Sequence, residues 1–371
     1  MEKRKLLITL IVSALSVSFI FLIIFIYSLN IKSSPVQLQE CKAIRFNGND
    51  KINLVFFSDK NTAERYTNHL METTPIRENK DKFNFFYIDS YKPDCKLYKE
   101  IALLCYSKDL IKTASSCPND YVVVVEKQSP EIRSSSYMNV MSINSRHPSS
   151  VLTHEFGHAF ANLAEEYVPA RLPREAKNCV SSCSEFSEIK DGCFEGCSRD
   201  DYTRSIENGV MRTLESNAYG KFNSFLVQSR INENTEKNSK ITGSVISPEL
   251  DCENQKYFLI TGVYQNQEVR ITSREIADGC VGSNGFGEFK FNVILKDGQV
   301  IHSGDFNAEL IFTDSPATEA NTDLTGEIFE NSGEFILKIP ILEKAAKLQI
   351  IYNGKIGELK LNDIGARPCR I

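Results

Sequence analysis

The stretch from residue 137 to residue 167, YMNVMSINSRHPSSVLTHEFGHAFANLAEEY, contains the residues on which the fold prediction depends. Its first part, Tyr137 to Ile143, has the composition of a β-strand. Pro148 follows, and a serine N-cap candidate then predicts a helix from about Ser149 to Glu166. A strand followed by an apolar helix predicts one unit of a mixed sheet with helices packed on it.

Earlier segments extend this pattern towards the N-terminus. Ile52–Phe57 (INLVFF), Phe83–Ile88 (FNFFYI) and Tyr121–Val125 (YVVVV) are short apolar runs that predict buried strands. Thr62–Met71 and the stretches around Tyr98–Leu110 have helical composition between them. We therefore expect an α/β (α+β) domain over residues 31–231.

The character of the chain changes after residue 240. The segment Asn232–Lys240 is polar and lacks periodicity, which predicts a linker. Beyond it, Asp297-Gly298 and Asn353-Gly354 are strong hairpin turn signals between short β-type runs. These features predict a β-rich accessory domain over residues 241–371, an all-β sandwich-like module. The expected strands are Tyr257–Val263, Gly287–Leu295, Ala308–Phe312, Gly333–Ile339 and Lys347–Tyr352.

The first thirty residues predict a membrane anchor. Lys3, Arg4 and Lys5 precede Leu6–Leu29, 24 residues without a charge, which is long enough to span a bilayer as a helix. Basic residues before the apolar run predict a cytoplasmic N-terminus and export of the rest of the chain, hence a single-pass protein of the cell membrane. A cleaved signal peptide and a buried core helix are the alternatives.

Cysteine usage fits an exported protein, because disulfides persist in oxidising compartments. The chain has eleven cysteines, and the pattern Cys179-x3-Cys183 followed by Cys193-x3-Cys197 is the informative part. A spacing of four places each pair on one face of a helix. This predicts a hairpin insertion over residues 179–197, stapled by nested bridges between its outer and between its inner cysteines. A four-cysteine zinc site is the rival interpretation, although zinc knuckles usually have the tighter C-x2-C spacing.

The remaining cysteines suggest three further pairings. Cys252 and Cys280 are expected to pair within the C-terminal region. One bridge is expected within a group of three: Cys95, Cys105 and Cys117. Cys41 and Cys369 are left with the third member of that group, and an odd total leaves at least one thiol unpaired or paired between chains.

The motif with chemical content is His154-Glu155-Phe156-Gly157-His158, which uses two of only five histidines. On a helix, His154 and His158 point the same way, so both imidazoles can bind one Zn²⁺. Zinc lowers the pKa of water and polarises a scissile carbonyl, and Glu155 can act as the general base. An extended peptide could add to the preceding strand. The motif therefore predicts a zinc hydrolase, with a coincidental surface helix as the alternative.

Such a site needs a third protein ligand. In the metzincin pattern H-E-x-x-H-x-x-G-x-x-H, the last two conserved positions correspond to Ala161 and Ala164, and neither matches. Glu165 and Glu166 follow, too far along a straight helix to reach the metal. The chain must therefore turn near Ala161-Asn162. If the chain after the turn is extended, the side chain of residue 166 points to the same side as that of residue 164, the metzincin ligand position. This favours Glu166 as the third ligand, with Glu165 as the alternative.

The run from His154 to Tyr167 resembles the signature of the IgA-peptidase-type metallopeptidases, peptidase family M64. That family has H-E-F-G-H followed by a Leu-Ala-Asp-Glu-Tyr-like segment; here Glu165 replaces the usual Asp and Ala161 the usual Gly. The looser resemblance covers roughly residues 50–230 and includes Ile52–Phe57 followed by Asp59. Downstream, Gly209-Val210-Met211-Arg212 is similar to the family's Met-Arg segment. The resemblance implies a metzincin-like zinc endopeptidase in which Met211 is a Met-turn residue beneath the zinc.

Composition restricts the partners that we expect. The 43 basic and 48 acidic residues give a net charge of −5, which disfavours an electrostatic nucleic-acid binder. We expect a membrane-anchored, extracytoplasmic zinc endopeptidase that acts on protein or peptide substrates by metal-activated water, with Tyr167, Tyr202 and Tyr219 as candidates for stabilising an oxyanion. The alternatives are a non-catalytic cell-surface binding or adhesion protein on a peptidase scaffold, and an amidase of cell-wall peptides.

Overall fold

The computed structural model describes residues 38–241, 252–265, 268–282, 285, 287–308, 311–313 and 333–361, without side chains for 236–241. The described residues from Leu38 onward belong to one compact unit. The predicted anchor at Leu6–Leu29 and Cys369 lie outside the described residues. No helix within the described ranges is long and apolar enough to cross a membrane.

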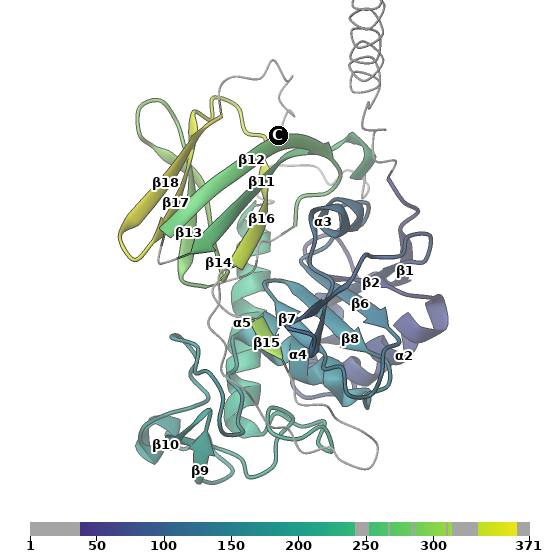
Figure 1. The fold of residues 1–371 in the computed structure, drawn as a ribbon, viewed down its shortest axis with the longest axis vertical. Helices are drawn as coiled ribbons and strands as arrows, with labels where there is room; N and C mark the ends of the chain where they lie inside the picture. The colour runs from purple at the N-terminus through teal and green to yellow at the C-terminus, as the bar shows by residue number, and fades with distance from the viewer. Residues whose placement is uncertain are drawn as a thin grey trace, which may run out of the picture. The chain divides into compact units, whose positions relative to one another are not determined.

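A mixed seven-stranded sheet forms the centre of the first half, in the order β1-β3-β2-β6-β8-β7-β15 (Figure 1). Strands β3, β2, β6 and β8 are parallel, whereas β1, β7 and β15 pair in antiparallel fashion at the two edges. Its members are β1 (Lys42–Arg45), β2 (Ile52–Phe57), β3 (Phe83–Ile88), β6 (Tyr121–Glu126), β7 (Ser135–Tyr137), β8 (Val140–Asn144) and β15 (Ile311–Thr313). The three upstream strands expected from sequence are confirmed. The expected strand Tyr137–Ile143 is instead split into β7 and β8, because Met138 adopts a positive φ of 52° and reverses the chain.

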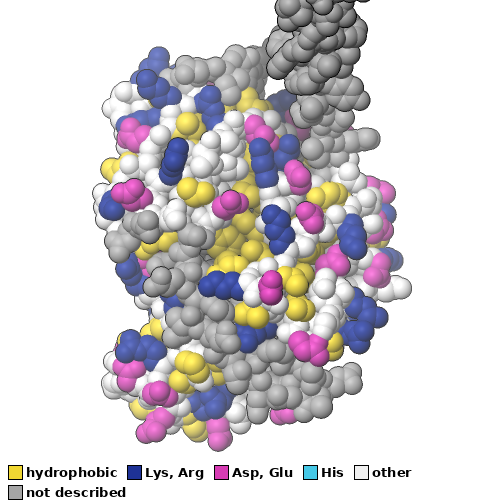
Figure 2. Space-filling view, in the orientation of Figure 1, with side chains coloured by type: hydrophobic (Ala, Val, Ile, Leu, Met, Phe, Trp, Pro, Cys, Tyr) yellow, Lys and Arg dark blue, Asp and Glu magenta, His cyan; other side chains and the backbone are white. Residues whose placement is uncertain are grey.

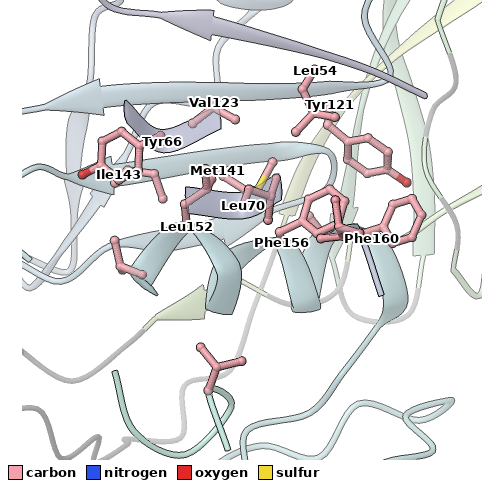
Figure 3. Close-up of a cluster of buried hydrophobic side chains, with 14 of the residues drawn as sticks. Leu54, Tyr66, Leu70, Tyr121, Val123, Met141, Ile143, Leu152, Phe156 and Phe160 are labelled. Carbon is pink, nitrogen blue, oxygen red and sulfur yellow. The ribbon is translucent and has the colours of Figure 1, made fainter. Parts of the chain in front are cut away.

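Helices and the β-module bury both faces of this sheet, which explains why its parallel strands are almost continuously apolar. One face packs on α2 (Lys60–Met71), α4 (Ser150–Ala161) and the first part of α5 (Lys221–Ile241). Figure 3 shows Phe156 and Phe160 of α4 next to Tyr121 of the sheet. The other face packs on α3 (Lys108–Ala114) and on strands of the β-module.

The expectations for Tyr98–Leu110 and Asn232–Lys240 were wrong. The region Tyr98–Leu110 contains a short hairpin, β4 (Lys96–Tyr98) and β5 (Ala102–Leu104), and only its end enters α3. The segment expected as a linker, Asn232–Lys240, continues α5. The buried Ile231 anchors this helix in the core, so the polar residues beyond it extend a helix that tertiary packing has already nucleated. The described residues also contain three 3₁₀ segments: η1 (Arg77–Lys82), which is kinked at Asn79, η2 (Cys183–Phe186) and η3 (Cys252–Asn254).

The C-terminal region forms two sheets that share one apolar core, as the sequence predicted for a sandwich. One sheet has the order β12-β11-β16 and the other β14-β13-β17-β18. Asn353-Gly354 turns the β17–β18 hairpin with positive φ at both residues, and Gly298 has a positive φ between β13 and β14. The strands are β11 (Lys256–Gln265), β12 (Glu268–Asp278), β13 (Phe289–Ile294), β14 (Val300–Phe306), β16 (Gly333–Pro340), β17 (Lys347–Tyr352) and β18 (Lys355–Lys360). One buried cation lies at the junction with the first half: Lys338 Nζ donates to Asn119 Oδ1 at 2.7 Å.

The expected strand Ala308–Phe312 corresponds to β15, but it does not join the sandwich. It pairs with β7 at the edge of the large sheet, with Ile311 opposite Tyr137 and Phe312 opposite Ser136. Figure 1 shows β15 beside β7, far in sequence from the other strands of that sheet. A short segment of the C-terminal region thus completes the sheet of the first half.

Five disulfides form among the described cysteines, which indicates an oxidising environment. The nested pairs Cys179–Cys197 and Cys183–Cys193 and the pair Cys252–Cys280 are confirmed. Cys95 pairs with Cys105, and Cys41 takes the third member of that group, Cys117. The insertion is not a pair of helices: η2 is followed by β9 (Phe194–Cys197) and β10 (Arg199–Arg204). Nested bridges require only that the two chain segments run side by side, which a hairpin of any secondary structure satisfies.

Candidate metal centre

Helix α4 supplies the histidine pair and then ends where the sequence predicted a turn. Asn162 is in the left-handed region (φ 52°, ψ 36°), and its backbone N–H bonds back to His158 O. The N–H of Leu163 bonds to Gly157 O. Asparagine tolerates this conformation better than most residues, so the chain reverses here and returns along the helix towards the histidines.

The two imidazoles are held in matching orientations. His154 Nδ1 lies 2.8 Å from Val210 O, and His158 Nδ1 lies 2.6 Å from Leu163 O. Carbonyls only accept hydrogen bonds, so each Nδ1 carries the proton and each Nε2 presents a lone pair. The two Nε2 atoms are 2.9 Å apart, and both side chains are fully buried. Carbonyl partners of this kind are the usual outer support of metal-binding histidines.

Glu165 completes the cluster. Its carboxylate oxygens lie 3.3 Å from His154 Nε2 and 3.1 Å from His158 Nε2, and the three ligand atoms lie within 4.8 Å of one another. Bonds of 2.0–2.1 Å to a tetrahedral ion would place ligand atoms about 3.3 Å apart. Three acceptor groups that converge at this spacing in a buried site fit a divalent cation such as Zn²⁺.

The carboxylate of Glu165 is held in its charged form. Burial by itself would raise the pKa of this carboxyl, but the positive charge and the N–H donors that His158 and His154 carry when protonated hold it well below its ordinary value, and a cation bound between the same Nε2 atoms would act in the same direction. An ionised carboxylate is the form that a metal ligand requires.

The sequence preference for Glu166 does not agree with this geometry. Its Oε1 accepts from Asn223 Nδ2 at 2.8 Å and from Asn178 Nδ2 at 3.2 Å, away from the histidine pair. Burial raises the pKa of Glu166 to about 7, although both asparagines act in the opposite direction. The alternation argument failed because no β-strand follows Asn162: the left-handed turn resets the direction in which side chains point.

The segment that contains Met211 packs beneath α4. A Cβ atom on Gly157 would lie 2.7 Å from Met211 Sδ, so the absence of a side chain at Gly157 admits the thioether between the two histidine positions. Met211 is fully buried, and its carbonyl accepts from the N–H of Glu166 at 2.9 Å. Arg212 donates to the carbonyl of Glu166 at 3.0 Å. The segment therefore contacts both the helix and the returning chain, and the Met-turn role of Met211 stays a prediction.

The cysteine-stapled insertion fixes the backbone around Glu165, which sequence reasoning did not anticipate. Ser198 Oγ donates to Glu165 O at 2.7 Å, and Cys179 Sγ lies 3.5 Å from the same carbonyl. Asn178 bonds to both the N–H and the carbonyl of Ala164. Asn178 and Ser198 each adjoin a cysteine of the outer bridge, and that adjacency was the only available signal.

The structure also gives the surroundings of the predicted general base and of the three tyrosines that were candidates for stabilising an oxyanion. Glu155 follows His154 on α4 and is fully buried. Tyr219 donates its hydroxyl to Thr153 O inside the core, which indicates a packing role. Tyr167 Oη lies 3.4 Å from Thr313 O, next to β15. Tyr202 packs on the cysteine-stapled insertion beneath the guanidinium of Arg199.

Phe312 of β15 covers His158. Its ring stacks on the imidazole of His158, with centroids 4.0 Å apart and planes 13° apart. A surface pocket of about 310 Å³ lies nearby, lined in part by Asn162, Arg171 and Asn307, but neither histidine nor Glu165 lines it. The described residues on the face shown in Figure 2 present mixed acidic and basic side chains and no histidine.

No protein-family model matches this sequence, and no curated protein matches it either. Any functional assignment therefore depends on the residues themselves and on the resemblance of the motif.

Proposed function

We propose that this chain is a zinc-dependent, metzincin-like endopeptidase, as its resemblance to the IgA-peptidase-type family implies. The observation that carries the proposal is the convergence of His154 Nε2, His158 Nε2 and the Glu165 carboxylate, with both Nδ1 atoms directed at carbonyls. Three protein ligands that leave a fourth position available are the arrangement of catalytic rather than structural zinc sites.

Each residue has a defined task in this proposal. His154, His158 and Glu165 would hold the metal, which when bound would supply Lewis-acid activation of water and of the scissile carbonyl. Glu155, next to His154 on the helix, takes the proton from the attacking water and delivers it to the leaving amine. Met211 and Gly157 fix the floor beneath the ligands. The outer edge of strand β7, which β15 occupies in this structure, is the edge on which an extended peptide would pair.

The protein acts outside the cytoplasm in this proposal. Five disulfides require an oxidising compartment, and the uncharged segment Leu6–Leu29 would anchor the chain in the cell membrane with its N-terminus in the cytoplasm. A non-catalytic binding protein on the same scaffold would not need Glu155, and an amidase of cell-wall peptides would share the site and differ in substrate.

The decisive experiment compares the wild type with Glu155→Gln. Both proteins are purified, loaded with zinc, and analysed for zinc stoichiometry and for cleavage of a peptide library and of cell-wall fragments. We expect one zinc per chain in both proteins and peptide cleavage by the wild type alone. Peptide cleavage by Glu155→Gln would refute the assignment of the base, and absence of zinc from the wild type would favour the binding protein.

A further inference from the structure

The histidine pair and Glu165 are almost completely shielded from solvent, although a peptidase must admit a polypeptide to its metal. His154 and Glu155 are 0% exposed, His158 is 1% exposed and Glu165 is 4% exposed. Part of the chain therefore fills the space through which a substrate would reach these residues, and it is the part that contacts His158.

That space is occupied by β15. It runs antiparallel to β7, the edge strand that would otherwise present unpaired N–H and C=O groups to an extended peptide. Phe312, in the middle of its three residues, stacks on the imidazole of His158. The segment thus combines main-chain pairing with a side chain over the metal ligands, which is how an extended peptide ligand would bind there.

Further contacts hold the segment to the rest of the chain. Tyr137 Oη donates to Glu334 O at 2.8 Å and lies 3.2 Å from Ala308 O, so one residue of β7 contacts the chain both before and after β15. Glu334 belongs to β16 in the sandwich. The sandwich therefore presents β15 to the edge of the large sheet from a fixed base.

Resting on the function proposed above, we infer that the chain inhibits its own peptidase site: β15 occupies the peptide-binding edge of β7, and Phe312 covers His158 as an internal competitor of substrate. The pairing covers all three residues of β7, so a substrate peptide and β15 compete for the same main-chain groups. The β-sandwich then has a regulatory task, because it sets the effective concentration of the inhibitory segment.

The test uses full-length, zinc-loaded protein in four forms: wild type, Phe312→Ala, Ile311→Pro and the control Ile356→Ala. Ile356 is 57% exposed on β18, so its truncation shortens an apolar side chain without touching β7 or β15. Burial of a phenylalanine ring stabilises a closed state by at least one factor of ten. We therefore expect Phe312→Ala to raise kcat/KM for a peptide substrate by about tenfold or more, and the control to match the wild type. Ile311→Pro removes one backbone N–H from β15 and is expected to act in the same direction.

Two readouts do not depend on turnover. Acetohydroxamate, a small zinc ligand, should bind Phe312→Ala about tenfold more tightly than wild type. Hydrogen exchange at Ser135–Tyr137 should be faster in Phe312→Ala and Ile311→Pro than in the control. Unchanged hydroxamate affinity and unchanged exchange in both variants would overturn the inhibitory role even if the protein is a peptidase. Tighter hydroxamate binding without peptide cleavage by any form would support the cover and refute the peptidase function separately.

Discussion

The choice between two adjacent glutamates is the sharpest test of the metal centre. Glu165 contacts both histidine Nε2 atoms at 3.1 and 3.3 Å, whereas Glu166 accepts hydrogen bonds from Asn178 and Asn223. Glu165→Gln and Glu166→Gln are matched substitutions of equal size that each remove one carboxylate. Only the first is expected to abolish tight zinc binding.

The expected loss of zinc affinity depends on whether the glutamate contacts the two histidines. Outer-shell partners of a metal ligand typically contribute 10- to 100-fold to affinity, so loss of the charged ligand itself should exceed 100-fold, about 2.7 kcal/mol or more. In Glu166→Gln, the amide oxygen can still accept from Asn178 and Asn223, and no charge in contact with the histidines is lost. Its zinc affinity should remain within about tenfold of the wild type.

The assay is competition for zinc against a chromophoric chelator, with the dissociation constant measured for each full-length variant. Circular dichroism and thermal unfolding establish that both variants are folded. Wild-type zinc affinity in Glu165→Gln, or an equal loss in both variants, would refute the ligand assignment made from the geometry.

Three further predictions concern the frame of the site and the fold. Replacing the Cys179–Cys197 bridge by serines should weaken zinc binding, because its cysteines adjoin Asn178 and Ser198, whose side chains bond to the backbone of Ala164 and Glu165. Replacing the Cys183–Cys193 bridge should leave zinc affinity unchanged and cost about 2–3 kcal/mol of stability in chemical denaturation. Burial lowers the pKa of Lys338 to about 7. Because the unfolded chain keeps this proton to higher pH, the unfolding free energy of the wild type should rise by about 3 kcal/mol from this group between pH 7 and pH 10. Chemical denaturation measured across this pH range should show that Lys338→Met lacks the rise. Asn162→Val should lower the unfolding free energy by about 1–2 kcal/mol because its φ is positive, and Asn162→Gly should be nearly neutral.

The sequence by itself determined the features that depend on local pattern. The apolar runs were enough to predict β2, β3 and β6, because a strand that is apolar on both sides is stable only in a sheet whose two faces are both covered. A spacing of four on α4 placed His154 and His158 together, because 3.6 residues form one turn. The spacing of the cysteines was enough to predict the nested pairs, since cross-linking depends on proximity rather than on secondary structure.

Tertiary structure decided which of the two glutamates meets the histidines. A left-handed Asn162 and the hydrogen bonds from Asn178 and Ser198 set the direction of Glu165, and these partners lie 13 or more residues away in sequence. It also decided that Ile311–Thr313 leaves the sandwich for the edge of β7 and brings Phe312 onto His158. A three-residue strand has too little intrinsic preference to specify its pairing partner. Its partner is specified by the edge of β7 and by the space over the imidazole of His158 that accepts the Phe312 ring. Both of these exist only after the chain has folded.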